Sequence, residues 1–175
     1  MLRRNHGCPW KAGGFLPRSV ACVMATGMLL HASSVALEGE AVLLLGPPGS
    51  GKSDLVLRLI DRGWRLVADD QVALAAEAGL LRAAPPPALR GMLEVRGLGI
   101  FRDLPVAAPA PLRLVARLVP RAEITRLPEP ERWTASGITL PVIRLDGFAA
   151  SAVAALGFAL DAALGRRRQQ AGAFA

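Results

Sequence analysis

The feature that most constrains this chain is an eight-residue loop over residues 46–53, with the pattern Gly-x-x-x-x-Gly-Lys-Ser. A continuous apolar run, residues 41–45, precedes the loop and is typical of a buried strand. Residues 52–62 follow with apolar side chains along one helical face, and Gly63 ends the pattern. The sequence therefore predicts a strand, a phosphate-binding loop and a helix in succession, within an α/β fold.

Each fixed position of the loop has a chemical reason. Glycines let the backbone curl so that successive N–H groups point at phosphate oxygens, and the following helix adds its positive dipole end. Lys52 supplies a charge for the β- and γ-phosphates of ATP, and the Ser53 hydroxyl is a ligand for Mg²⁺. A chance glycine-rich turn is disfavoured by the flanking strand and helix. The predicted nucleotide-binding residues are Gly46, Pro47, Pro48, Gly49, Ser50, Gly51, Lys52 and Ser53.

Two adjacent carboxylates, Asp69 and Asp70, follow the next predicted strand, residues 65–68. Ligands of α/β sheets bind beyond the carboxyl ends of strands. One carboxylate there could take a proton from a substrate hydroxyl, and the other could hold a metal-bound water. Because neighbours in an extended chain point to opposite sides, only one is expected to face the phosphates directly. A solvated Asp-Asp turn is an equal alternative on spacing alone.

Three further polar residues are candidates for the same site. His31 precedes the first predicted core strand, although a lone His is more often a packing or surface residue. Glu94 and Arg96 flank Val95 and therefore share one face of an extended segment. The carboxylate could serve Mg²⁺ and the guanidinium could neutralise a transferring phosphate; a cross-strand ion pair is the alternative.

Composition limits the classes of function. The chain has 175 residues, 52% of them apolar, which is enough for one globular domain. The net charge of +7 suggests nucleic acid, but Tyr is absent and aromatics are 5%, so stacking platforms are scarce and no such partner is expected. No run approaches the roughly 20 apolar residues of a membrane span. Cys8 and Cys22 give no disulfide framework or metal spacing, which fits a reduced, intracellular setting.

The chain is expected to form one domain with an extension at each end. Residues 1–27 are interpreted as a poorly ordered N-terminal extension, 28–165 as the P-loop domain and 166–175 as a solvated basic tail. Met24 or Met28 is an alternative start. A secretion signal is disfavoured because the charged segment before the apolar stretch is long.

Outside the loop region, the pattern predicts a hairpin from residues 72–75 and 80–83 and a last strand over 140–145. Residues 107–111 are interpreted as a linker because Ala and Pro dominate them. An Ala-rich helix is predicted over 149–164. The side chains expected to be buried along it are Val153, Leu156, Phe158, Leu160 and Leu164.

Together these residues resemble the catalytic domain of HPr kinase/phosphorylase. Four pieces match in order: His31, the P-loop, residues 62–70 and residues 93–100. Residues 62–70 read Arg-Gly-Trp-Arg-Leu-Val-Ala-Asp-Asp, one change from the stretch typical of the family. Residues 93–100 read Leu-Glu-Val-Arg-Gly-Leu-Gly-Ile, close to the family signature. The match covers about residues 31–100.

The resemblance implies a role for each candidate residue. Asp69 would be the general base in the kinase direction and the general acid in the reverse, with His31 orienting it. Ser53 and Glu94 would lie at the metal, where Asp70 is also placed, and Lys52 and Arg96 would be catalytic. The departures are Asp54 in place of the usual Glu, and residues 139–147, which lack the Pro-Gly-Arg-Asn segment of longer members. The missing Arg leaves the phosphorylase direction open.

The resemblance also implies a fold, an activity and partners. The fold would be a P-loop kinase domain with a mixed β-sheet like that of phosphoenolpyruvate carboxykinase. The activity would be that of an ATP-dependent, Mg²⁺-dependent serine kinase, acting on an HPr-like phosphocarrier protein in a cytoplasmic, regulatory role. Family members are typically homohexamers. A nucleotide-sensing module without turnover and a P-loop kinase of a small molecule are the alternatives.

Overall fold

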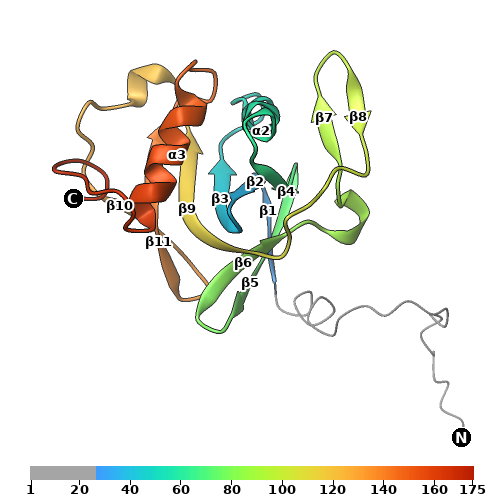
Figure 1. The fold of residues 1–175 in the computed structure, drawn as a ribbon, viewed down its shortest axis with the longest axis horizontal. Coiled ribbons are helices and arrows are strands. Elements are labelled where there is room, and N and C mark those ends of the chain that lie inside the picture. Colours follow the sequence, from blue (N-terminus) through green and yellow to red (C-terminus); the bar gives the residue numbers. More distant parts are fainter. Residues whose placement is uncertain (1–26) are drawn as a thin grey trace, which may run out of the picture.

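The computed structural model describes residues 27–175 (Figure 1). The expected N-terminal extension, with both cysteines, lies outside the described residues except for Gly27. From that residue to the C-terminus, no helix is long and apolar enough to cross a membrane.

The body of the molecule is one curled, mixed sheet, as expected. Its strands are β1 (Met28–His31), β2 (Ser33–Leu37), β3 (Glu40–Leu45), β4 (Arg65–Ala68), β5 (Gln71–Glu77), β6 (Leu80–Ala84), β9 (Ala110–Leu118), β10 (Glu131–Ala135) and β11 (Ile138–Leu145). The order is β1-β5-β6-β9-β3-β2-β4, and the β10–β11 hairpin joins it through β11 and β9. A separate hairpin, β7 (Leu93–Val95) and β8 (Gly99–Phe101), projects from the body (Figure 1).

Strand direction brings four strand ends to the same edge. The neighbours β3, β9 and β11 are parallel. Strand β4 also runs the same way as β3, because β2 lies between them and is antiparallel to both. The carboxyl ends of these strands are where α/β sheets place their ligands. The segments that follow β3, β4 and β11 therefore meet at one edge.

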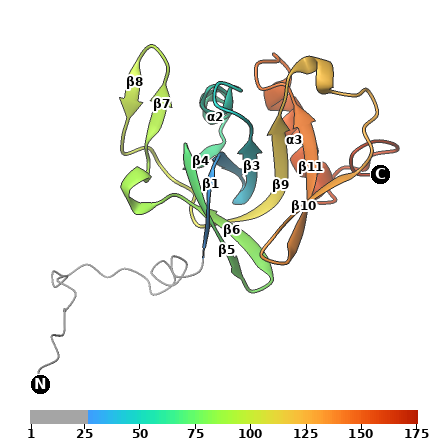
Figure 2. The same cartoon turned by 180° about the vertical axis from the view of Figure 1, so that it is seen from behind.

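Two helices, α2 (Lys52–Asp61) and α3 (Ala152–Ala163), pack on one face of the sheet (Figures 1 and 2). Alternation along β3 divides its side chains between two cores: Val42 and Leu44 face the helices, and Leu43 faces the opposite side. On that side the curled arms of the sheet close a second core with residues from β5, β6 and β11. Each fully buried Leu contributes about 1.5–3 kcal/mol through apolar burial.

Most of the predicted elements are confirmed, including the P-loop helix, strand β4 and the β5–β6 hairpin. The linker prediction is wrong in part, because Ala110 and Pro111 begin β9 and pair with β6. Strand β10 was not predicted. Along α3, Leu156 and Leu160 are buried as expected. Phe158 is 58% exposed instead, and the guanidinium of Arg167 lies 3.9 Å from its ring centroid.

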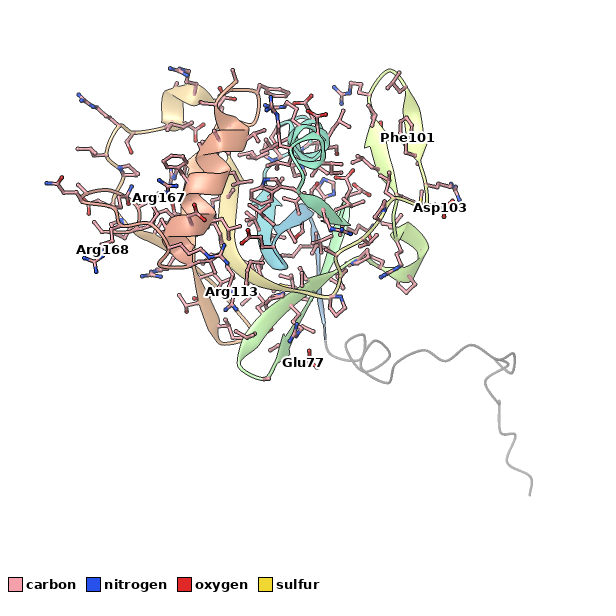
Figure 3. All side chains as sticks on the ribbon, in the orientation of Figure 1. Glu77, Phe101, Asp103, Arg113, Arg167 and Arg168 are labelled. Atoms are coloured by element: carbon pink, nitrogen blue, oxygen red, sulfur yellow. The ribbon has the colours of Figure 1, made fainter. Side chains whose placement is uncertain are left out.

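The C-terminal residues pack back onto the domain rather than extending into solvent. The Arg166 guanidinium pairs with Glu38 at 2.7 Å, Ala173 is buried, and Phe174 packs against the helix-side core. Figure 3 shows Arg167 and Arg168 beside α3, at the opposite end of the molecule from Phe101 on the β7–β8 hairpin.

Candidate functional site

The P-loop connects the end of β3 to the first turn of α2, as the sequence predicted. Gly49 and Gly51 have φ of 80° and 89°, in the left-handed region that glycine enters without strain. A Cβ on Gly46 would lie 2.5 Å from Ser50 Oγ, so the loop closes tightly on itself. Among residues 27–175, the buried Ser50 hydroxyl has no hydrogen-bond partner. A buried polar atom without a partner, inside a loop of this shape, fits a site for phosphate oxygens.

Lys52 lies inside the loop rather than in open solvent. Its Nζ donates to the carbonyl oxygens of Gly46 at 2.9 Å and Pro47 at 3.1 Å. Burial lowers the pKa of Lys52 below its usual value of 10.5, and the nearby carboxylates Asp69 and Asp70 oppose that shift. The ammonium group is therefore held at the loop with carboxylates close by.

Asp69 is buried directly after β4, and its hydrogen bonds connect the end of β4 to β2 and to α2. Its Oδ1 accepts a hydrogen bond from Ser33 Oγ at 2.6 Å and another from Ser53 Oγ at 3.1 Å. Ser33 is fully buried on β2, and Ser53 lies in the first turn of α2. This carboxylate is therefore fixed beside the P-loop hydroxyl.

Asp70 takes the opposite orientation, as the alternation argument expected. Its φ is 66°, a conformation that Asp tolerates better than most residues, and its side chain is 62% exposed. Oδ1 lies 3.2 Å from Nδ1 of His31. The reason is the register of β1 on β5, which places His31 opposite Gln71, directly after Asp70. The structure thus pairs His31 with Asp70, whereas the resemblance implied Asp69.

A cavity of about 450 Å³, within the range of ligand sites, brings the remaining candidates together. Glu94, Val95 and Arg96 form part of its wall, and no ion pair joins Glu94 to Arg96 among the described residues. The predicted residues that line it are His31, Pro48, Gly49, Gly51, Lys52, Ser53, Asp70, Glu94 and Arg96. Asp69 lies behind this surface, hydrogen-bonded to Ser33 and Ser53, both of which line the cavity.

Sequence reasoning missed Ser33 and the loop over residues 146–149. Ser33 has a weak signal, a small polar residue at the start of a buried strand. In the loop, Arg58 of α2 donates to the carbonyl oxygen of Gly147 and, at 3.2 Å, to that of Ala149. Phe148 in this loop also lines the cavity. No spacing in the sequence could have connected Phe148 to a P-loop about 100 residues earlier.

The oxygen ligands at the site suit Mg²⁺. Within residues 27–175 no group of three or more His, Cys, Asp and Glu side chains could hold a metal ion alone. Mg²⁺ does not need such a group, because it usually takes one or two carboxylates together with waters and substrate phosphates. The Ser53 hydroxyl beside the Asp69 carboxylate provides oxygen atoms of that type at the loop.

Comparison with known proteins finds similarity over most of this domain. The family described as HPr Serine kinase C-terminal domain matches residues 23–104. The HPr kinase/phosphorylases of Burkholderia lata and Burkholderia cenocepacia are each 38% identical over 132 residues, which is 70% of this chain and 41% of theirs. The chain therefore spans about two fifths of the length of these curated relatives.

A solved structure, the Hpr(Ser) kinase/phosphatase from Coxiella burnetii, is similar in three dimensions as well. The two chains are 30% identical, with a TM-score of 0.62, and the match covers 67% of this chain and 85% of that one.

Proposed function

This chain belongs to the HPr serine kinase family, and we propose that it is an ATP-dependent, Mg²⁺-dependent kinase that phosphorylates a seryl residue of an HPr-like phosphocarrier protein. One observation carries the proposal: the P-loop lysine and an exposed carboxylate, Asp70, line the same cavity. A phosphate donor and an alcohol acceptor can therefore be held side by side there.

Asp70 is the proton acceptor in this proposal, and Asp69 is the carboxylate at the metal. Asp70 faces the cavity and has His31 beside it, so an incoming hydroxyl can reach it. Asp69 is buried and fixed by Ser33 and Ser53, which suits a group that positions a cation. The geometry thus favours exchanging the roles that the resemblance implied for the two carboxylates.

The reaction then needs little covalent chemistry from the protein. The seryl oxygen attacks the γ-phosphorus, its proton moves to the Asp70 carboxylate, and the bond to the β,γ-bridging oxygen breaks to release ADP. Lys52 and the amides at the start of α2 stabilise the phosphate charge, and Arg96, which lines the same cavity, adds a guanidinium. Mg²⁺ held at Ser53, Asp69 and Glu94 would supply further charge neutralisation on the phosphates. Positioning and electrostatics account for most of the rate.

The partners and setting follow from the same proposal. The acceptor is a small phosphocarrier protein, the working assembly is a homo-oligomer, and the location is the cytoplasm. These three statements are supported by the membership of this chain in the HPr serine kinase family.

The direct test is phosphoryl transfer from γ-labelled ATP with purified full-length chain and the HPr-like proteins of the same cell. We expect label on a seryl side chain, none on a carrier whose seryl residue is replaced by Ala, and none with Lys52→Ala enzyme. Label on a small acceptor instead would indicate a small-molecule kinase. Tight ATP binding with no transfer to any acceptor would indicate a sensing module.

A further inference from the structure

An exposed aromatic ring lies in this cavity, and the proposed chemistry does not use it. Phe148 lines the cavity and is 63% exposed. Its Cε1 and Cζ atoms lie 3.1 Å from the position that a Cβ on Gly51 would take. The ring therefore lies against the end of the P-loop, with most of its surface open to an incoming ligand.

The strand order gives the P-loop two different flanks. From β3, the path β2 then β4 leads to Asp69 and Asp70, whereas the path β9 then β11 leads in the other direction to residues 146–149. The γ-phosphate must face the carboxylates, because transfer occurs there. The nucleoside end of the same molecule must then extend toward the opposite flank, where Phe148 lies.

The Phe148 loop is held rigidly enough to present the ring. A Cβ on Gly147 would lie 2.6 Å from the carbonyl oxygen of Ser50, so the two loops touch backbone to backbone. Arg58 binds the Gly147 and Ala149 carbonyl oxygens, and the Phe148 N–H donates to Asp146 Oδ1 at 3.0 Å. The backbone that carries the ring is thus fixed before any ligand arrives, which lowers the entropic cost of binding.

We infer that Phe148 is the platform on which the base of the nucleotide stacks, an assignment that rests on the proposed function. Stacking on an aromatic side chain accepts any base, because every base has a π-face. The platform therefore strengthens binding of nucleotides and contributes nothing to the binding of the triphosphate group by itself.

The test compares Mg²⁺-ATP with Mg²⁺-tripolyphosphate, which has phosphates but no nucleoside, by isothermal titration calorimetry on the full chain. Phe148→Ala should weaken ATP binding about 5- to 150-fold, the range of one base–aromatic stack, and leave tripolyphosphate binding unchanged. Phe148→Trp should retain ATP affinity. Phe158→Ala, which removes a similarly exposed ring at 58% on the surface of α3, is the matched control and should bind both ligands as wild type does.

Four results would overturn the assignment, and the last of them overturns the proposed function as well. Equal weakening of both ligands by Phe148→Ala would mean that the ring only shapes the P-loop. Unchanged affinity for both, with slower transfer to the carrier protein, would mean that the ring contacts the carrier. A wild-type chain that binds tripolyphosphate as tightly as ATP would have no base platform. If wild type binds neither ligand, the proposed function fails, and this inference fails with it.

Discussion

The two flanks of the P-loop solve different problems by different physical means. On the β4 flank, Asp69 is fixed by hydrogen bonds from two serines, and Asp70 is turned outward by a left-handed backbone. On the β11 flank, residues 146–149 are fixed by backbone packing and by Arg58, and they present an apolar ring. On the flank where phosphoryl transfer would occur, hydrogen bonds and backbone conformation fix individual carboxylates. On the flank that would only hold the nucleotide, backbone packing fixes a loop that presents an apolar ring.

The largest effect on the rate of phosphoryl transfer is expected from a substitution on the β4 flank. Asp70→Asn should lower the rate of phosphoryl transfer about 10²- to 10⁴-fold, the usual contribution of a general base, while ATP affinity changes little. Asn is the suitable replacement because it tolerates the φ of 66° at this position. Transfer kinetics and ATP titration on the same preparation measure both quantities. Transfer at the wild-type rate would exclude Asp70 as the base.

The next prediction separates two neighbouring serines that are equally buried. Ser33 donates to Asp69, whereas Ser34 donates to the carbonyl oxygen of Val42 at 2.9 Å. Ser33→Ala should raise the Mg²⁺ concentration for half-maximal transfer about 10- to 100-fold, as expected when a metal ligand loses its orienting partner. Ser34→Ala should cost comparable stability and leave the Mg²⁺ dependence unchanged. Equal Mg²⁺ curves for both variants would contradict a metal role for Asp69.

A third prediction sharpens the account of the β11 flank. Gly147→Ala should lower the free energy of unfolding by about 1–3 kcal/mol and weaken ATP binding, because the new Cβ would meet the Ser50 carbonyl. Gly157→Ala in α3 is the matched control: its Cβ would meet nothing within 4 Å, and it should stabilise the protein by about 0.5–1 kcal/mol. Denaturant unfolding and ATP titration distinguish them. Unaltered stability in Gly147→Ala would mean that the two loops are not in close contact.

The smallest expected effect concerns Lys52, which lies between the flanks. Burial lowers its pKa in the folded chain below 10.5, so between the two values the unfolded chain binds more protons. The free energy of unfolding should therefore increase as the pH rises through that window. Below the lowered pKa, the cost of keeping the charged Lys52 buried destabilises the folded chain most. Lys52→Met should lack this gain. Urea unfolding at a series of alkaline pH values in phosphate-free buffer checks it, and parallel profiles for the two proteins would contradict the shift.

The sequence indicated most of the functional residues on the polar flank and none on the apolar one. Binding a triphosphate requires glycines, a lysine and carboxylates at set positions. Their occurrence near one cavity could therefore be predicted from the sequence. Which carboxylate faces the cavity could not, because it depends on the φ of Asp70 and on the β1–β5 register. Phe148 and Phe158 look alike in sequence; the helical pattern wrongly favoured burial of Phe158, and no pattern indicated Phe148.

Strand β10 shows a third reason for failure. It begins Glu131-Arg132 and lacks an apolar run, so nothing in its pattern predicted a strand. Glu131 is stabilised by cross-strand partners, Arg117 on β9 and Arg144 on β11, that only the folded sheet supplies. Tertiary pairing decides the structure of such a segment.

The most direct measurement of the central claim is a crystal structure of the full chain with a non-hydrolysable ATP analogue and Mg²⁺. The account predicts a triphosphate in the P-loop, with its terminal phosphate on the β4 flank beside Asp70 and its base against the Phe148 ring. A base lying at His31 and Asp70, or a triphosphate outside the loop, would contradict it.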